Sequence, residues 1–117
     1  MRGGLRMIAV DIMLIRDRVR AGHYLIRSHA VLHALKEGFE RKDMVEAILT
    51  GSIIEAYPDD KRVLICGTTP LTENVTLYLH IVCAYVDAVF IEIITAYIPD
   101  PLLWENPPLR RRKRKRN

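Results

Sequence analysis

The side chains of this sequence that are best suited to proton transfer are His29, His80 and Tyr97. His29 lies at the expected start of a helix, where free backbone amides and the helix dipole lower the affinity of an imidazole for its proton. A neutral imidazole can act as a base, and a tyrosine hydroxyl can donate a proton or stack on an aromatic base. The alternatives are that His29 is a cap or a buried hydrogen-bonding residue, and that Tyr97 only packs within a strand.

His80 belongs to an expected strand from Val75 to Tyr85, and the next expected strand, from Val89 to Ile98, carries Glu92. If even-numbered positions of these strands pair, Glu92 lies on the face of His80, where a carboxylate would orient the ring and raise its pKa. A register shifted by one residue places them on opposite faces. The alternative is a half-exposed polar pair at a sheet edge.

Other patterns in the sequence predict neither a metal nor a cofactor. His29 and His33 are four residues apart on one helix face, which can suit a metal, but no third ligand is placed. Cys66 and Cys83 lie in apolar runs and are predicted to be buried free thiols, which fits a reducing, cytoplasmic location; the alternative is a disulfide between adjacent strands. There is no glycine-rich phosphate loop and no nucleophile elbow.

The basic residues are concentrated at the C-terminus. Arg110–Arg116 holds seven of the 18 basic residues, so residues 1–109 carry 11 basic and 14 acidic groups, a net charge of −3. We predict a disordered basic tail over residues 106–117, which either contacts nucleic acid or only solubilises the chain. No apolar run reaches the roughly 18 residues of a membrane span, so no membrane partner is expected.

Three helices are expected in the first half of the chain. The spacing of Ile8, Ile12, Ile15 and Val19 predicts a helix from about residue 8 to residue 20, ended by Gly22. A short strand-like segment, 24–27, precedes a second helix that begins at the N-cap Ser28 and ends at Gly38. Its residues Val31, Leu32 and Leu35 are expected to face a core, and Phe39 to fold back onto its last turn. A third helix runs from Arg41 to Gly51.

Four strands are expected after the helices, at 52–57, 62–67, 75–85 and 89–98, and the last two form a hairpin. Residues 68–74, which include Pro70, are expected to form a polar loop. The predicted class is α+β, with N-terminal helices packed on a mostly antiparallel sheet. A single domain spans residues 1–105, of which 1–8 are an extended N-terminus. Trp104 either packs a C-terminal segment onto the sheet or is an exposed anchor for a partner.

Several motifs in a fixed order resemble one family. They are Ser28-His29-Ala30, Gly38-Phe39-x-Arg41-x-Asp43, Ile48-Leu49-x-Gly51-x-Ile53-Ile54-Glu55, Tyr57-Pro58-Asp59-Asp60, His80-Ile81-Val82-Cys83 and the closing stretch from Ile94 to Glu105. Over roughly residues 9–105 the chain resembles domain of unknown function family 4258, which looks related to the RelE/ParE-like toxins. The resemblance implies the RelE/ParE-like toxin fold.

The resemblance also implies a function. The chain would be the toxin of a type II toxin–antitoxin pair and a metal-independent messenger-RNA endoribonuclease, neutralised by a cognate antitoxin and acting on RNA or the ribosome. His29 or His80 would be the base and Tyr97 a stacking or proton-donating group, and phosphate contacts would come from Arg27, Arg41, Arg62, Arg110, Arg111 and Arg112. The alternative is a non-catalytic protein-interaction module of the same fold, which the net charge of −3 favours.

Overall fold

The computed structural model describes residues 10–113, which form three α-helices and five strands. In chain order the elements are α1 (Ile12–Arg20), β1 (Tyr24–Ile26), α2 (Ser28–Glu37), α3 (Arg41–Thr50), β2 (Ser52–Tyr57), the 3₁₀ turn η2 (Pro58–Asp60), β3 (Arg62–Thr72), β4 (Val75–Ala84) and β5 (Ile91–Tyr97). The α+β class is confirmed. None of the helices within these residues is long and apolar enough to cross a membrane.

The five strands form one mixed sheet in the order β1-β5-β4-β3-β2. Strands β2 to β5 are an antiparallel meander, and the expected hairpin of β4 and β5 is confirmed. The short strand β1 pairs in parallel with β5 and forms one edge of the sheet.

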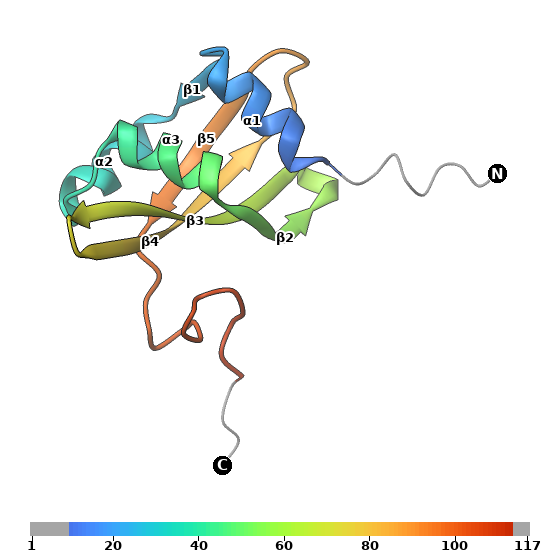
Figure 1. Cartoon of the computed structure of the whole chain (residues 1–117). Coiled ribbons are helices and arrows are strands. Elements are labelled where there is room, and N and C mark those ends of the chain that lie inside the picture. The colour runs from blue at the N-terminus through green and yellow to red at the C-terminus, as the bar shows by residue number, and fades with distance from the viewer. Residues whose placement is uncertain (1–9, 114–117) are drawn as a thin grey trace.

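The two faces of the sheet are covered differently. On one face, alternate residues such as Val63, Ile65 and Ile81 join Ile15 and Ile48 of the helices in the main core. Figure 1 shows the three helices on this side and the chain after β5 on the other. We call the face opposite the helices the outer face, and residues 99–113, which cross it, the C-terminal strap.

Two glycines explain how the helices meet the sheet. Gly38 has a φ of +85° and ends α2 in the left-handed region, where Ala34 accepts hydrogen bonds from the amides of Gly38 and Phe39. Phe39 is buried, so its predicted fold-back is confirmed. A Cβ at Gly67 would lie 1.7 Å from the carbonyl oxygen of Ala47, so α3 can touch β3 only because this residue has no side chain.

The helix starts differ from those expected. The first helix begins at Ile12, because the Asp11 carboxylate caps it by accepting a hydrogen bond from the amide of Met13. Ile8 lies outside the described residues. Ser28 is the first residue of α2 rather than its cap, and the capping position is Arg27, which makes no side-chain capping bond.

The polar loop expected at residues 68–74 is wrong, because β3 continues to Thr72. The paired length of β2 ends where Ser52 meets Cys66, and beyond Thr68, which is bonded to the Thr50 side chain, one edge of β3 is free. Pro70 is tolerated in a strand with such a free edge, since no neighbour there requires its missing N–H.

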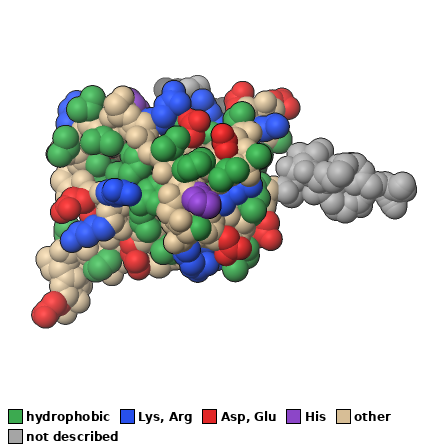
Figure 2. Space-filling model, turned by 90° about the horizontal axis from the view of Figure 1, so that it is seen from above, with side chains coloured by type: hydrophobic (Ala, Val, Ile, Leu, Met, Phe, Trp, Pro, Cys, Tyr) green, Lys and Arg blue, Asp and Glu red, His purple; other side chains and the backbone are tan. Residues whose placement is uncertain are grey.

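The apolar face predicted for α2 is also wrong. Val31, Leu32 and Leu35 are 41%, 61% and 72% exposed, and the helix instead buries Ala30 and Ala34. These two small side chains are one turn apart and allow α2 to lie close to β5. The larger side chains are therefore turned to the surface, and Figure 2 shows hydrophobic groups in the open on the helix side.

Candidate functional site

His80 is the centre of a polar cluster on the outer face. It lies on β4 between Cys66 of β3 and Tyr97 of β5, and it is completely buried. Its Nδ1 atom is 3.3 Å from the hydroxyl oxygen of Tyr97. The structure therefore brings two of the three predicted acid–base residues together.

The hydrogen bonds of His80 define its proton position. Its Nε2 atom is 2.8 Å from the carbonyl oxygen of Pro108, which can only accept, so Nε2 carries the proton. In the neutral ring Nδ1 then accepts from the Tyr97 hydroxyl. Burial lowers the pKa of His80, although the bond to Pro108 opposes this, and burial raises the pKa of Tyr97. Both side chains are thus held in their neutral forms.

The strap closes over this pair through Trp104. The indole ring lies edge-on to the His80 ring, with centroids 4.4 Å apart, and is buried. The Arg111 guanidinium lies over the indole, 4.6 Å from its centroid. Packing of a C-terminal segment onto the sheet by Trp104 is confirmed, and an exposed Trp104 is excluded.

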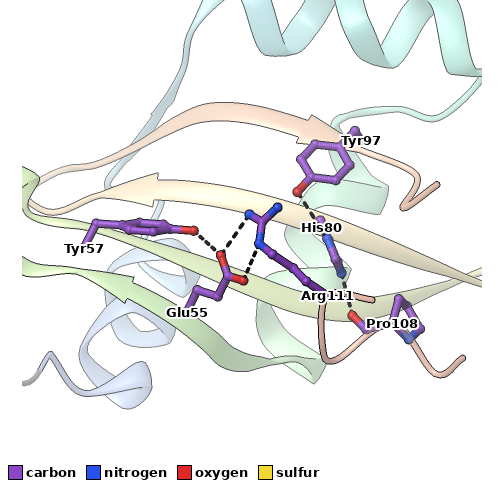
Figure 3. A network of polar contacts seen from close by, with 6 residues as sticks. All are labelled: Glu55, Tyr57, His80, Tyr97, Pro108 and Arg111. Atoms are coloured by element: carbon purple, nitrogen blue, oxygen red, sulfur yellow. Dashed lines mark hydrogen bonds and ion pairs between the residues drawn. The ribbon is translucent and has the colours of Figure 1, made fainter. Parts of the chain in front are cut away.

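Arg111 ties the strap to the edge strand β2 (Figure 3). Its Nε and a terminal nitrogen donate to the two carboxylate oxygens of Glu55 at 2.8 and 3.1 Å, and the Tyr57 hydroxyl also donates to this carboxylate. The bond to Arg111 lowers the pKa of Glu55 and raises that of Arg111, whereas burial, followed by the bond to Glu55, raises the pKa of Tyr57.

Glu55 and Tyr57 were missed by the sequence reasoning. They are two residues apart on β2, and the sheet register places them on the same side as Leu64 and Arg62. That spacing was the available signal. Their partner is Arg111, more than fifty positions along the chain, and no pattern in the sequence predicts that contact.

The expected boundary at residue 105, with a disordered tail after it, differs from the structure. Pro108 and Arg111 contact the sheet, and the Arg112 amide donates to Leu103. Residues 106–113 thus belong to the folded body, while 114–117 lie outside the described residues.

His29 does not join the cluster. It is exposed on α2, on the helix side, with its ring centroid 6.1 Å from that of His33. His33 is hydrogen bonded to Glu37 at 3.0 Å. The alternative of a buried His29 is therefore wrong. Within residues 10–113 no three side chains are grouped as metal ligands.

The pairing of His80 with Glu92 is wrong. The register places Tyr97 opposite His80 and Glu92 opposite Ala84, four residues along β4 from His80. Glu92 therefore lies on the face of His80 but out of its reach. Glu92 instead forms an ion pair with Arg27 at 2.7 Å. His80 is also neither half-exposed nor at an edge, because β4 lies inside the sheet.

The predicted phosphate-binding arginines divide between the two sides. Arg41 begins α3 on the helix side and donates to the Tyr24 hydroxyl at 3.0 Å. Arg62 and Arg27 lie by the outer face, and the strap adds Arg110, Arg111 and Arg112. Tyr57 and Tyr78 are partly exposed on the outer face as well. The outer face thus combines arginines with open aromatic rings.

The cysteine prediction is confirmed, since Cys66 and Cys83 are buried free thiols. Burial raises the pKa of Cys66 to about 11 and that of Cys83 to about 12, so neither is a reactive thiolate near neutral pH.

Comparison with known proteins gives one family. The family model described as "Domain of unknown function (DUF4258)" matches residues 26–98. No curated protein and no solved structure matches the chain. The matched region contains His29, His80 and Tyr97, whereas Trp104 and Arg111 of the strap lie beyond it.

Proposed function

Since the chain belongs to the DUF4258 family, a domain of unknown function, we propose its function from its own side chains: it is an RNA-binding protein of the RelE/ParE-like toxin type. The RNA lies on the outer face of the sheet. A cognate antitoxin protein is the expected regulatory partner of a toxin of this type.

The observation that carries this proposal is the anchoring of a basic segment beside open aromatic rings. The ion pair of Arg111 with Glu55 holds the strap on the sheet, so its exposed neighbours Arg110, Arg112 and Lys113 stay near the outer face. Cations in this position neutralise phosphates and release counterions. Exposed tyrosines such as Tyr57 and Tyr78 offer stacking surfaces to unpaired bases, the common mode of single-stranded RNA recognition.

RNA cleavage is supported less well than RNA binding. Tyr97 would be the proton donor to the leaving oxygen, but in this conformation its single hydroxyl proton is donated to the Nδ1 atom of His80. His80 is buried and its second nitrogen is bonded to Pro108, so it cannot reach a 2′-hydroxyl while the strap is in place. It is also the one histidine in the five strands. An endoribonuclease would need the strap to lift.

The RNA-binding proposal is tested by the salt dependence of affinity. We expect Arg62→Gln combined with Arg110→Gln to weaken binding of a labelled single-stranded RNA of about ten nucleotides, and to reduce the slope of log K against log salt by about 1.4, or 0.7 per lost phosphate contact. The matched control is Arg20→Gln with Lys36→Gln, two exposed cations on the helix side. Equal effects of the two pairs, or no RNA binding by the native chain, would contradict the proposal.

A second candidate, a protein-interaction module, is favoured by the exposed face of α2. Val31 and Leu35 line a cavity of about 510 Å³ together with Leu25 of β1 and the buried Phe39 and Met44. Contiguous exposed apolar groups of this kind mark protein-binding surfaces. The surface lies on the helix side of the sheet, opposite the strap, so a partner bound there would leave the outer face open (Figure 1).

Co-expression with the product of the neighbouring gene tests this candidate. We expect Leu32→Glu with Leu35→Glu to abolish co-purification, whereas Met13→Glu, a matched change at an exposed apolar residue of α1, leaves it intact. Retention of the partner by the α2 double variant excludes α2 as the binding surface.

A further inference from the structure

A cavity of about 430 Å³ lies between the beginning of β4 and the strap, and it adjoins the His80 hydrogen-bond network at Pro108. Its lining includes Thr76, Tyr78, Pro99, Trp104, Asn106 and Arg112. We propose that this cavity binds one nucleotide of a single-stranded RNA, with the base stacked on Tyr78 and the phosphate on Arg112. The inference rests on the proposed RNA-binding function and adds to it the place where one base is held.

The cavity has the size and the walls of a site for a planar base. Its volume is in the range of small-molecule sites, which are mostly apolar with a few polar groups. Tyr78 is 39% exposed and supplies an aromatic surface, while Pro99 and Pro101 supply flat apolar ones. The buried indole of Trp104 closes the bottom.

The charged groups of the cavity suit a phosphate. The Arg112 Nε donates to the carbonyl oxygen of Pro101 at 2.6 Å, which fixes the side chain. Within residues 10–113 its terminal nitrogens have no protein partner, so they are available to phosphate oxygens. The lining holds one basic residue, Arg112, and one acidic residue, Glu105, and Arg112 belongs to the basic run that begins at Arg110. The phosphate is therefore assigned to Arg112.

Polar groups for the edge of a base are also present. The Asn106 side chain makes no hydrogen bond within the described residues, and its amide can both donate and accept. The Glu105 carboxylate can accept from an exocyclic amino group of a base. These two residues are adjacent in the strap, opposite Tyr78 of the sheet.

The strap wall of the cavity is held in place by contacts with the sheet that do not involve Tyr78, Asn106 or Arg112. The Pro108 carbonyl is bonded to His80 and Arg111 is bonded to Glu55, so the strap is attached to the sheet at two points after Asn106, while Trp104 packs on His80 before it. Changing Tyr78, Asn106 or Arg112 therefore alters the cavity without cutting either attachment.

The chain's single tryptophan provides the readout, because Trp104 lines the cavity. The four ribonucleoside 5′-monophosphates are added as separate probes while the Trp104 emission is measured. We expect at least one of them to produce a saturable change in emission. Inorganic phosphate at the same concentrations should produce none. Tyr78→Ala should weaken both nucleotide and RNA binding about five- to hundredfold, the loss expected for one stacked base. Tyr78→Phe, which keeps the aromatic ring, should retain both affinities.

Arg112→Gln and Arg110→Gln are matched substitutions, because both remove an arginine of the strap. Of these two arginines only Arg112 lines the cavity. We expect only Arg112→Gln to weaken monophosphate binding. If RNA binds the native chain, but no monophosphate changes the emission and Tyr78→Ala leaves RNA affinity unchanged, this inference is overturned and the proposed function stands. If a monophosphate binds but RNA does not, the proposed function is overturned and the nucleotide site stands.

Discussion

At the scale of single residues, His80 shows how burial and hydrogen bonding determine what a side chain can do. A neutral imidazole satisfies both neighbours, because it donates to Pro108 and accepts from Tyr97. Protonation would place a second donor against the Tyr97 hydroxyl and a charge in a fully buried site. The physical role of His80 in this conformation is to fasten the strap to the sheet.

A pH dependence of stability follows from the lowered pKa of His80. Between pH 6.5, the ordinary value, and its folded pKa, the unfolded chain binds the proton and the folded chain does not. Stability is therefore fully present above pH 6.5 and falls as the pH falls through that window. We expect the free energy of unfolding in urea to decrease from about pH 7.5 to about pH 5.

The control for this measurement is His80→Gln, which should abolish the decrease in that window. The lowered pKa of Glu55 gives a separate loss of stability that begins only below pH 4.5, so the two effects can be resolved. A native chain whose unfolding free energy is constant over the upper window would contradict the assignment of His80.

We predict that Glu55 and Arg111 are energetically coupled, so that their substitutions have non-additive effects on the free energy of unfolding. Arg111 is largely exposed but makes a two-pronged contact, so we expect a coupling energy of about 1 kcal/mol. A double-mutant cycle with Glu55→Gln and Arg111→Gln, measured by urea denaturation, gives this quantity. Strictly additive effects would show that the pair does not hold the strap.

At the scale of elements, the contact of α3 with β3 depends on Gly67. A methyl group there would meet the backbone of Ala47 rather than a flexible side chain, so the helix would have to move. We expect Gly67→Ala to cost more than about 3 kcal/mol of unfolding free energy. Gly22→Ala is the control: its φ is +80° but nothing lies within 4 Å, so strain of about 1 kcal/mol is its whole cost. Equal losses would disprove the close approach.

Periodicity in the sequence predicted the types of the elements and much of their order. It failed where two sets of residues on one helix could each have formed the buried face. In α2, the positions of Val31, Leu32 and Leu35 and those of Ala30 and Ala34 both follow a helical spacing. Size favoured the first set, whereas close packing against β5 buried the second. Similarly, alternation predicted the strand with His80 but not the hairpin register, which places Tyr97 rather than Glu92 opposite it.

At the scale of the whole molecule, the sheet lies between a layer of helices and the C-terminal strap (Figure 1). The strap has no regular secondary structure, and its position depends on contacts such as Trp104 with His80 and Arg111 with Glu55. No local pattern encodes such contacts, which explains why half of the candidate site was missed. The same contacts convert a basic tail into part of the outer face.

The most direct test of the account is a map of amide chemical shifts on addition of a short single-stranded RNA. We predict that the shifts concentrate on the outer face and the strap, around Tyr57, Tyr78 and Arg112, and leave the surface of α2 unchanged. Shifts confined to α2 around Leu32, with the strands and the strap unaffected, would contradict the central claim that RNA binds the face opposite the helices.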